Sequence, residues 1–325
     1  MDMEKLCPGC MRMLDAQEQA GTEKTQKQSG AGKTAQNRGS AQKKSPCCPY
    51  CGFDPSAYRQ NPRCLPLNTI LAGKYLVGKV LGEGGFGITY MGYDLNMKTR
   101  VAIKEYFPVE LVTRDTTRRP SAGEAPSAAV SASGGGSDRV ISLSGEKSKT
   151  YQQGLKKYVD EARNVSQFSG TPGVVSVKDF FYENDTAYIV MEYIEGVSLK
   201  EYLKQKGGKL SEEEALAILR PVLEALEKVH GAGIVHRDIS PDNIMLIFAG
   251  ATETAAGAVY GSIAAVRLID FGAARMTAKN DQKSLTIILK HGYAPEEQYR
   301  SHGEQGPWTD VYALCAVLYR MLTGK

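Results

Sequence analysis

The chain has 325 residues, of which 42% are hydrophobic, so it can form one medium-sized domain with a sizeable core and appendages. Lys and Arg number 40 against 36 Asp and Glu, and this near balance gives no argument for binding nucleic acid or a membrane surface. No run approaches the roughly 18 consecutive apolar residues of a membrane span, and the first residues lack the apolar core of a signal peptide. The sequence therefore predicts a cytoplasmic protein.

Two Cys-Pro-x-Cys pairs open the chain. Cys7 and Cys10 form the first pair, and Cys48 and Cys51 form the second. Each pair can turn two thiolates toward one metal, and two pairs make a tetrahedral sulfur site suited to Zn²⁺. The arrangement resembles a zinc ribbon. Redox-active or merely free thiols are the alternative.

Three further cysteines need a separate interpretation. Cys47 is a possible substitute ligand, whereas Cys64 and Cys315 are expected to be plain thiols. The long separation between the two pairs is filled by a polar segment, about 15–45, which cannot bury enough apolar surface and is expected to be disordered. Loop closure becomes only slowly less favourable with length, so such an insert is compatible with a metal site.

A glycine-rich turn follows inside a strand-forming stretch, 74–94. Gly82, Gly84 and Gly87 form the pattern G-x-G-x-x-G, which lets a backbone approach phosphates closely. The same spacing occurs in ordinary turns and in dinucleotide-binding folds. A dinucleotide fingerprint opens a helix, however, whereas the residues after Gly87 continue as a strand. The next strand, 100–104, ends in Lys104, whose ammonium could reach phosphate oxygens or could simply meet water.

Further elements follow in chain order. The pattern predicts a flexible insert at about 114–148, a helix at 151–168, strands at 174–181 and 187–193, a helix at 211–230 and an enlarged hairpin loop at about 249–261. Ser211 and Glu214 form a capping box at the start of the second helix. Its Leu216, Leu219, Leu223 and Leu226 recur at helical spacing. Pro221 inside the same helix removes a backbone donor and could kink it.

The sequence HRDISPDN, from His236 to Asn243, is the most specific motif. It offers the Asp238 carboxylate to accept a hydroxyl proton and, five residues later, an Asn243 amide oxygen to bind Mg²⁺. Asp270 opens a D-F-G motif after an apolar strand, and its carboxylate can bind a metal that bridges phosphates. A chance D-F-G is common, but all four motifs in this order do not arise by chance.

Together these motifs resemble the protein kinase family, and more narrowly the bacterial serine/threonine kinases. The resemblance implies an α+β, two-lobed fold: a zinc-ribbon-like module at 1–56, a linker at 57–70 and a kinase domain at 71–325. Within that domain a β-rich N-lobe covers about 71–193 and a helical C-lobe covers about 194–325. The C-lobe resembles the family only to the start of its long buried helix, so it is expected to be truncated and to expose apolar surface.

The resemblance also implies the roles of the site residues. Lys104 contacts the ATP phosphates and pairs with Glu161, for which Asp160 is a rival. Asp238 is the catalytic base, and Asn243 and Asp270 hold Mg²⁺. Met191 guards the back of the nucleotide pocket, and the backbone of Glu192 to Ile194 hydrogen-bonds adenine. The expected ATP-binding residues are Leu81, Gly82, Glu83, Gly84, Gly85, Phe86, Gly87, Thr89, Ala102, Lys104, Met191, Glu192, Ile194 and Met245.

The chain departs from the family pattern at one catalytic position. The family has a lysine two residues after the catalytic aspartate, where this chain has Ser240. In LKHGYAP, Lys290 stands where the family has a threonine that lies close to that lysine. Lys290 is therefore predicted to supply the missing charge. The alternative is an exposed loop lysine.

The surrounding activation segment leaves other questions open. Arg237 precedes the catalytic aspartate, as in kinases that are switched on by phosphorylation of this segment. Thr277, Ser284 and Thr286 are candidate phosphosites, and each could equally be an unmodified hydroxyl. The glutamate that closes the segment is either Glu296 or Glu297.

The leading interpretation is an ATP- and Mg²⁺-dependent serine/threonine protein kinase that acts on protein substrates in signalling. An ATP-binding pseudokinase scaffold is the alternative, favoured by Ser240 and by the missing C-lobe helices. A kinase of small molecules fits less well, because the sequence carries a peptide-docking segment near Tyr293. No feature of the sequence points to nucleic acid or to a membrane.

Overall fold

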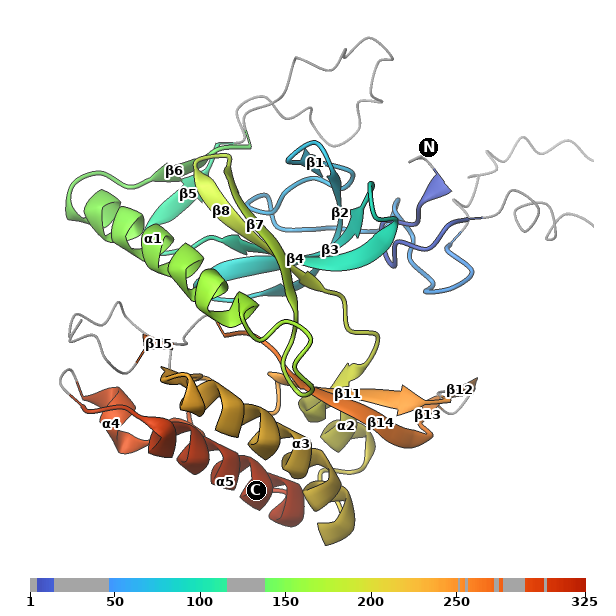
Figure 1. Ribbon diagram of the computed structural model, residues 1–325. Coiled ribbons are helices and arrows are strands. Elements are labelled where there is room, and N and C mark those ends of the chain that lie inside the picture. Colours follow the sequence, from blue (N-terminus) through green and yellow to red (C-terminus); the bar gives the residue numbers. More distant parts are fainter. Residues whose placement is uncertain are drawn as a thin grey trace, which may run out of the picture. The chain divides into compact units, whose positions relative to one another are not determined.

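The computed structural model describes residues 5–14, 47–115, 138–250, 252–254, 257–271, 275–276, 290–300 and 303–325 (Figure 1). The chain divides into two compact units. Unit 1 comprises Met1–Gly84, Ile88–Ile103 and Thr116–Asp138. Unit 2 comprises Gly85–Gly87, Lys104–Asp115 and Arg139–Lys325.

Unit 1 is built on antiparallel strands. They are β1 (Ile70–Leu71), β2 (Tyr75–Glu83), β3 (Gly87–Asp94) and the first part of β4 (Thr99–Tyr106). β2 pairs with β1 and with β3, so that Tyr75 lies opposite Asp94 and Glu83 lies opposite Ile88. Branched and aromatic side chains favour this pleated, buried setting, and nearly every residue of β3 is buried. The strands predicted at 74–94 and 100–104 are confirmed.

The segment before β1 lies along β2 and β3. Leu65 is fully buried, and its N–H donates to the Tyr90 hydroxyl at 3.1 Å. The N–H of Val77 donates to the Thr69 carbonyl at 2.8 Å, and the N–H of Asn68 donates to the Val77 carbonyl at 2.8 Å. The residues expected to form a linker, 57–70, thus shield the outer edge of β2, which would otherwise present unpaired backbone groups.

Unit 2 begins with a small hairpin, a helix and two strands. They are β5 (Val112–Arg114), β6 (Val140–Ser142), α1 (Glu146–Ser166), β7 (Val177–Glu183) and β8 (Thr186–Glu192). Hydrogen-bonded neighbours in the main sheet follow the order β1-β2-β3-β4-β8-β7, with β4 passing from unit 1 into unit 2.

The start of α1 differs from the sequence prediction. The helix begins at Glu146 and ends at Ser166, rather than spanning 151–168. β6 also lies inside the range expected to be flexible. The reason is tertiary, since β6 pairs with β5 and both strands bury a valine, Val140 and Val112.

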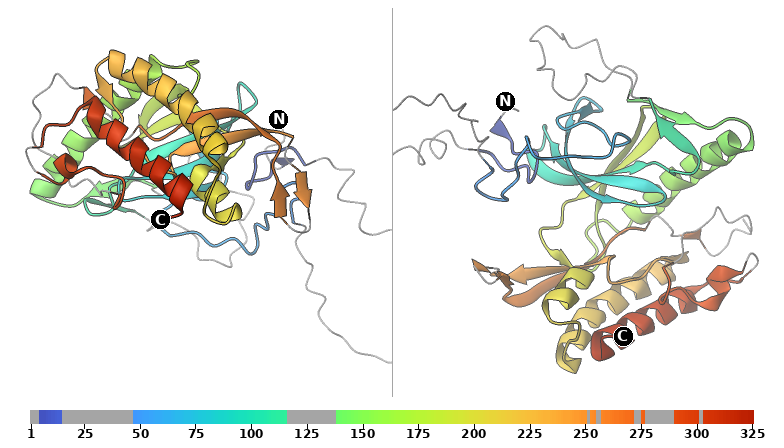
Figure 2. Two further views of the ribbon diagram at one scale, coloured as in Figure 1. Left: turned by 90° about the horizontal axis from the view of Figure 1, so that it is seen from below. Right: turned by 180° about the vertical axis from the view of Figure 1, so that it is seen from behind.

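Helices dominate the rest of unit 2. They are α2 (Leu199–Gln205), α3 (Glu212–Gly231), α4 (Glu296–Tyr299) and α5 (Pro307–Thr323). The predicted capping box of α3 is confirmed, because Ser211 accepts from the Glu214 N–H at 3.2 Å and Glu214 accepts from the Ser211 N–H at 3.3 Å. α3 continues through Pro221 as one helix. It lies beside α5, as Figures 1 and 2 show.

Short strands frame the loops that carry the motifs. They are β9 (Val197–Ser198), β10 (Ile234–Val235), β11 (Ile244–Ala249), β12 (Thr252–Thr254), β13 (Gly257–Val259), β14 (Ser262–Leu268) and β15 (Arg275–Met276). β11 pairs with β14, and β12 pairs with β13 in the chain between them. This extended ribbon confirms the enlarged hairpin predicted at about 249–261.

The helical part exposes several large apolar side chains, as the sequence predicted. On α3, Leu219 and Leu226 are buried, but Leu216 and Leu223 are about half exposed. On α5 the exposed residues are Trp308, Val311, Tyr312, Tyr319 and Leu322. Among the helices in the described ranges, none combines the length and apolarity that crossing a bilayer requires.

Candidate active site

The loop between β10 and β11 is held by side chains from distant helices. Asp310 of α5 is fully buried and accepts the backbone N–H groups of His236 (2.8 Å) and Arg237 (2.7 Å). Gln298 of α4 donates to the Arg237 carbonyl at 2.8 Å. A buried carboxylate with several donors fixes backbone geometry strongly. Sequence reasoning missed Asp310 and Gln298. A lone acidic residue inside the apolar run of α5 was the available signal.

His236 is fixed in one tautomer by the hydrogen-bond partners of its two ring nitrogens. Its Nε2 donates to the Ile269 carbonyl at 3.1 Å, and its Nδ1 accepts the N–H of Asp238 at 3.2 Å. One nitrogen therefore carries a proton and the other does not, which is the neutral imidazole. The ring also lies 4.4 Å from that of Phe271, measured between centroids. His236 thereby ties the HRD loop to the residues of the D-F-G motif.

Asp238 and Asn243 form the centre of the loop. The Nδ2 of Asn243 donates both to Asp238 Oδ2 and to the Asp238 carbonyl, each at 2.8 Å. The amide nitrogen is thus used for Asp238, and the amide oxygen is the atom of Asn243 that can bind a metal. Burial raises the pKa of Asp238, and the positive charge of Lys290 opposes that rise.

Asp270 follows β14 and forms an ion pair with Lys104. Its φ of 63° lies in the left-handed region, which is unfavourable for a residue other than glycine. Such strained residues concentrate at functional sites, where the surrounding fold over-determines them. The fold does so here, because the N–H of Ile269 donates to the Asn243 carbonyl at 2.9 Å. Asp270 and Asn243 thus come from chain segments that are joined directly.

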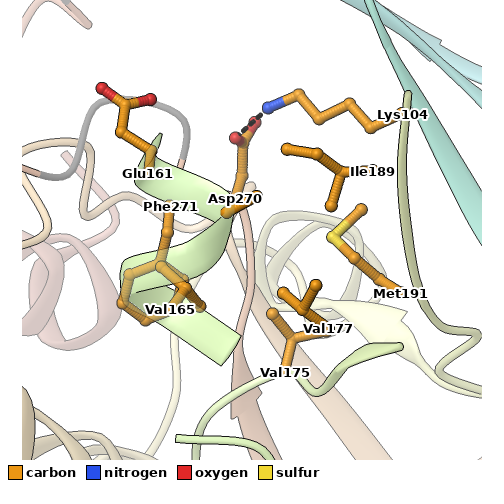
Figure 3. Close-up of a pocket in the computed structure, with 10 residues that line it drawn as sticks. Lys104, Glu161, Val165, Val175, Val177, Ile189, Met191, Asp270 and Phe271 are labelled. Atoms are coloured by element: carbon orange, nitrogen blue, oxygen red, sulfur yellow. Dashed lines mark hydrogen bonds and ion pairs between the residues drawn. The ribbon is translucent and has the colours of Figure 1, made fainter. Parts of the chain in front are cut away.

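Glu161 does not pair with Lys104 in this structure. Figure 3 shows Asp270 beside Lys104 and the carboxylate of Glu161 turned away from it. Lys104, Glu161 and Asp270 nevertheless line one small cavity of about 30 Å³. Met191, predicted to guard the back of the nucleotide pocket, also lines this cavity. The other lining residues are Ala162, Val165, Val175, Val177, Ile189 and Phe271.

Lys290 lies against the catalytic loop. Its Nζ donates to the Ser240 hydroxyl at 2.8 Å, and Ser240 is fully buried. The same nitrogen is 4.0 Å from a carboxylate oxygen of Asp238 and 3.6 Å from one of Asp242. The structure therefore brings together Lys290 and Ser240, 50 residues apart in sequence, as the sequence hypothesis requires.

The glycine-rich turn joins β2 to β3. Gly82 pairs with Thr89 across the hairpin, and both Leu81 and Phe86 are about 40% exposed. A Cβ on Gly87 would lie 2.5 Å from the Glu105 carbonyl oxygen, so no other residue fits there without a shift of backbone. Gly84 and Gly85 complete the turn.

The residues expected near adenine are half-buried. Glu192 ends β8, where its N–H donates to the Ser176 carbonyl and its carboxylate accepts the Ser176 N–H, both at 2.9 Å. Ile194 packs against the core of unit 2, and Met245 of β11 lies opposite Ser198 of β9. Ala102, in the unit 1 part of β4, is also half-buried.

The four paired cysteines form one cluster in unit 1. The Sγ atoms of Cys7 and Cys51 are 3.7 Å apart and those of Cys10 and Cys48 are 3.9 Å apart. A tetrahedral site with Zn–S bonds of roughly 2.3 Å places its sulfurs about 3.8 Å apart, and a disulfide places them at about 2.05 Å. The N–H of Gly9 donates to Cys7 Sγ at 3.3 Å, an interaction that stabilises a thiolate. The donor set and its spacing fit Zn²⁺.

Cys47, the substitute considered from sequence, is exposed and is not part of the cluster of possible metal ligands among the described residues. Glu297, rather than Glu296, faces the interior, because it accepts the Thr309 hydroxyl at 2.9 Å. Glu296 pairs with Arg300 at the surface. Thr277, Ser284 and Thr286 lie outside the described residues.

Comparison with known proteins identifies the family. The family model described as "Protein kinase domain" matches residues 139–325, more than half of the chain, so the chain belongs to the protein kinase family. It is 33% identical over 178 residues to a probable serine/threonine-protein kinase of Clostridium perfringens, covering 54% of this chain and 23% of that protein. It is 30% identical over 261 residues to serine/threonine-protein kinase F of Synechocystis, covering 79% of this chain and 45% of that protein.

A solved structure is also similar. PpkA-294 in its apo form matches with a TM-score of 0.60 and 33% identity, over 81% of this chain and 80% of that one. The kinase fold expected from the motifs is thereby confirmed. The chain spans less than half the length of the two curated relatives named above.

Proposed function

We propose that this chain transfers the γ-phosphate of ATP to serine or threonine hydroxyls of protein substrates, in cytoplasmic signalling. One observation supports the proposal most: unit 2 by itself holds the Asp238–Asn243 pair and the Lys104–Asp270 pair, linked by the bond between Ile269 and Asn243. These are the charged and polar groups that phosphoryl transfer uses for positioning and for neutralising charge.

Asp238 orients the substrate hydroxyl and accepts its proton. Burial keeps its pKa above the ordinary value for an aspartate, which makes it a better base once it is ionised. The hydrogen bond from Asn243 holds one carboxylate oxygen, Oδ2, and Asp310 fixes the backbone on which the carboxylate stands. The transfer therefore relies on a carboxylate whose position is set before substrate arrives.

Asn243 and Asp270 suit Mg²⁺ because both offer hard oxygen atoms. Held by these two side chains, the ion would supply positive charge that offsets the charge of the ATP phosphates. Lys104, paired with Asp270 here, contacts the α- and β-phosphates, and its pairing with Glu161 requires a different position of the Glu161 side chain from the one in Figure 3. The glycine-rich turn covers the phosphates with its N–H groups.

Lys290 supplies the positive charge that the catalytic loop lacks at Ser240. Its ammonium lies 4.0 Å from Asp238 and bonds the Ser240 hydroxyl, so it stands beside the carboxylate that receives the proton. A cation at this place stabilises the charge of the transferring phosphoryl group and favours the ionised form of Asp238. Lys290 thereby takes a catalytic role from a position distant in sequence.

The cysteine cluster would hold a structural zinc ion through Cys7, Cys10, Cys48 and Cys51. With four thiolate ligands, such an ion would have no open position for a water or a substrate. It would therefore stabilise the fold of the N-terminal module and take no part in the chemistry.

The test of the proposed activity is phosphate transfer from radiolabelled ATP with Mg²⁺, using a generic protein substrate and the chain itself. Replacing Asp238 with Asn should lower the rate by roughly 10²- to 10⁴-fold, because the proton acceptor is lost. Asp185→Asn, the same change at an exposed aspartate paired with Arg139, should keep most of the activity. If the folded protein binds ATP but the wild type labels nothing, the enzyme is excluded and the ATP-binding scaffold takes its place.

A further inference from the structure

The strand that leads into the glycine-rich turn is irregular. The register between β2 and β3 shifts between Val77 and Val80 and again between Val80 and Gly82. Such irregularities leave backbone groups of the bulged strand without partners on the neighbouring strand. β2 therefore has N–H groups just before the glycine-rich turn that need acceptors from elsewhere in unit 1.

The N-terminal module and the segment 57–70 that follows it provide those acceptors. The N–H of Lys79 donates to the carbonyl of Pro8, inside the first cysteine pair, at 2.9 Å. The N–H of Val80 donates to the hydroxyl of Tyr58, in the segment 57–70, at 2.9 Å. Two consecutive backbone amides of β2 are thus bonded, one to the module and one to the segment directly after it.

Close packing accompanies these hydrogen bonds. A Cβ on Gly78 would lie 2.4 Å from the Pro8 carbonyl oxygen and 2.5 Å from the end of the Met11 side chain, so β2 can approach the module only with glycine there. Met11 is 2% exposed. The Phe53 ring covers Gly9 and lies 5.1 Å from that of Tyr58, between centroids. The cysteine cluster, Tyr58 and β2 therefore form one continuous packed body.

A third link reaches the turn itself. Arg63 donates twice to one carboxylate oxygen of Glu83, from Nε at 3.0 Å and from a terminal nitrogen at 2.7 Å. Glu83 is the residue between the first two glycines of the turn. Both side chains are about one-third exposed, so the pair is worth little to global stability. It restrains the first part of the turn, whose second part is held where the N–H groups of Phe107 and Val109 donate to the carbonyls of Phe86 (3.0 Å) and Gly85 (3.2 Å).

We infer that the cysteine module positions the glycine-rich turn for nucleotide binding, with Arg63 as the positioning residue, so that zinc occupancy sets the affinity for ATP. This inference rests on the proposed function only in that the turn binds ATP phosphates. Without metal, no bond joins the two cysteine pairs, and the Pro8 carbonyl is no longer held against Lys79. Metal binding and local folding are coupled in such sites. The turn then samples more conformations, and ATP must restore order when it binds.

The first experiment measures the dissociation constant of MgATP for the full chain by isothermal titration calorimetry. Arg63→Ala should weaken binding roughly two- to fivefold, as loss of one surface ion pair does. Arg63→Lys should restore part of that loss. The matched control is Arg59→Ala, since within the part of the chain that the structure describes Arg59 bonds the nearby carbonyls of Ser56 and Tyr58. If Arg63→Ala binds MgATP as tightly as Arg59→Ala, the positioning role is excluded.

The second experiment removes the metal with a chelator, measures the zinc content, and repeats the titration. MgATP binding should weaken by more than the Arg63 effect, and hydrogen exchange should quicken at 75–90 while α3 keeps its protection. Readdition of Zn²⁺ should reverse both changes. A zinc-free chain with α3 protected and an unchanged dissociation constant would contradict the inference.

These outcomes are separable from the proposed activity, because neither readout requires phosphate transfer. If MgATP affinity depends on zinc in a chain that transfers no phosphate, the proposed kinase activity is excluded but the positioning role is supported. A zinc-independent affinity in an active kinase would do the reverse. The Arg63 variants keep the inference testable even if the zinc-free chain does not remain folded.

Discussion

The cysteine module of unit 1 and the catalytic loop of unit 2 are both irregular segments of backbone, but they are stabilised in different ways. Each holds irregular backbone in a fixed shape with a few side chains. In the module, the four clustered cysteines lie in two short motifs, and the zinc ion proposed to join them must come from outside. In the loop, the backbone of His236 and Arg237 is held by Asp310, which is more than 70 residues away and needs no ligand. The first device should respond to metal supply, and the second should not.

Removing a proposed metal ligand tests whether the cysteine module depends on metal, and it should have the largest effect on zinc content and on the folding of unit 1. Cys10→Ser should abolish stoichiometric zinc binding, since structural zinc sites contribute roughly 10–16 kcal/mol to folding. Metal analysis of purified protein and hydrogen exchange in unit 1 measure it. Cys47→Ser is the matched control, because Cys47 is adjacent to a ligand but exposed. Equal zinc content in both variants would refute the assigned ligand set.

Removing Asp310, which holds the catalytic loop, should have a smaller effect, but one that lowers the stability of the whole fold. Asp310→Ala leaves two buried N–H groups without an acceptor and should lower the free energy of unfolding by about 3–5 kcal/mol. Urea denaturation measures this, and the loss should be the same with and without zinc. Asp160→Ala, which removes an exposed carboxylate paired with Arg163, should change it by less than about 1 kcal/mol. A comparable loss in the two variants would show that Asp310 is not the anchor.

Lys290 is proposed to supply the charge beside Asp238, so its replacement should affect the rate of phosphate transfer rather than stability. Lys290→Met should lower kcat by roughly 10²-fold, the effect of losing one charge-stabilising group. The double variant Ser240→Lys with Lys290→Thr moves the positive charge from position 290 to position 240. It should recover much of the rate of phosphate transfer. If the kcat of the combined variant is no higher than that of Lys290→Met, the charge of Lys290 does not assist the transfer, and Lys290 serves only to hold Ser240 in place.

The pH dependence of kcat should show the smallest effect, and it tests whether the charge of Lys290 acts on Asp238. Burial raises the pKa of Asp238, and the Lys290 charge lowers it. Without that charge the pKa rises further, so the carboxylate stays protonated to higher pH. The acidic limb of the kcat profile should therefore move to higher pH in Lys290→Met. Lys200→Ala, which removes an exposed lysine paired with Asp242, should leave it unmoved.

Sequence reasoning succeeded where the information is local. The start of α3 was predicted because a capping box needs only Ser211 and Glu214, three residues apart. The β2–β3 hairpin was predicted because alternating strands flank a glycine-rich turn. Hydrophobic spacing on α3 was less informative, since only two of the four predicted leucines are buried. Which face of a helix is covered depends on its neighbours, and periodicity does not name them.

Other features depended on contacts that composition cannot reveal. Residues 57–70 have the composition of a linker, yet their backbone pairs with β2 because that strand has an open edge beyond the short β1. β6 lies within a stretch with the composition of a flexible loop, because β5 offers it a partner. In both places a neighbouring strand supplies the hydrogen bonds that the local sequence lacks.

The sequence by itself determined the family, and it predicted the catalytic groups and the four cysteines that the structure brings into one cluster. Those depend on residue types at short spacings, and the chemistry of phosphate and zinc restricts which types can serve. Only the tertiary structure decided that Lys104 pairs with Asp270 instead of Glu161, that Lys290 reaches Ser240, and that the cysteine module packs on the strand before the glycine-rich turn. Each of these joins residues far apart in the chain, and such contacts follow from how buried surfaces and backbone donors are satisfied across the whole fold.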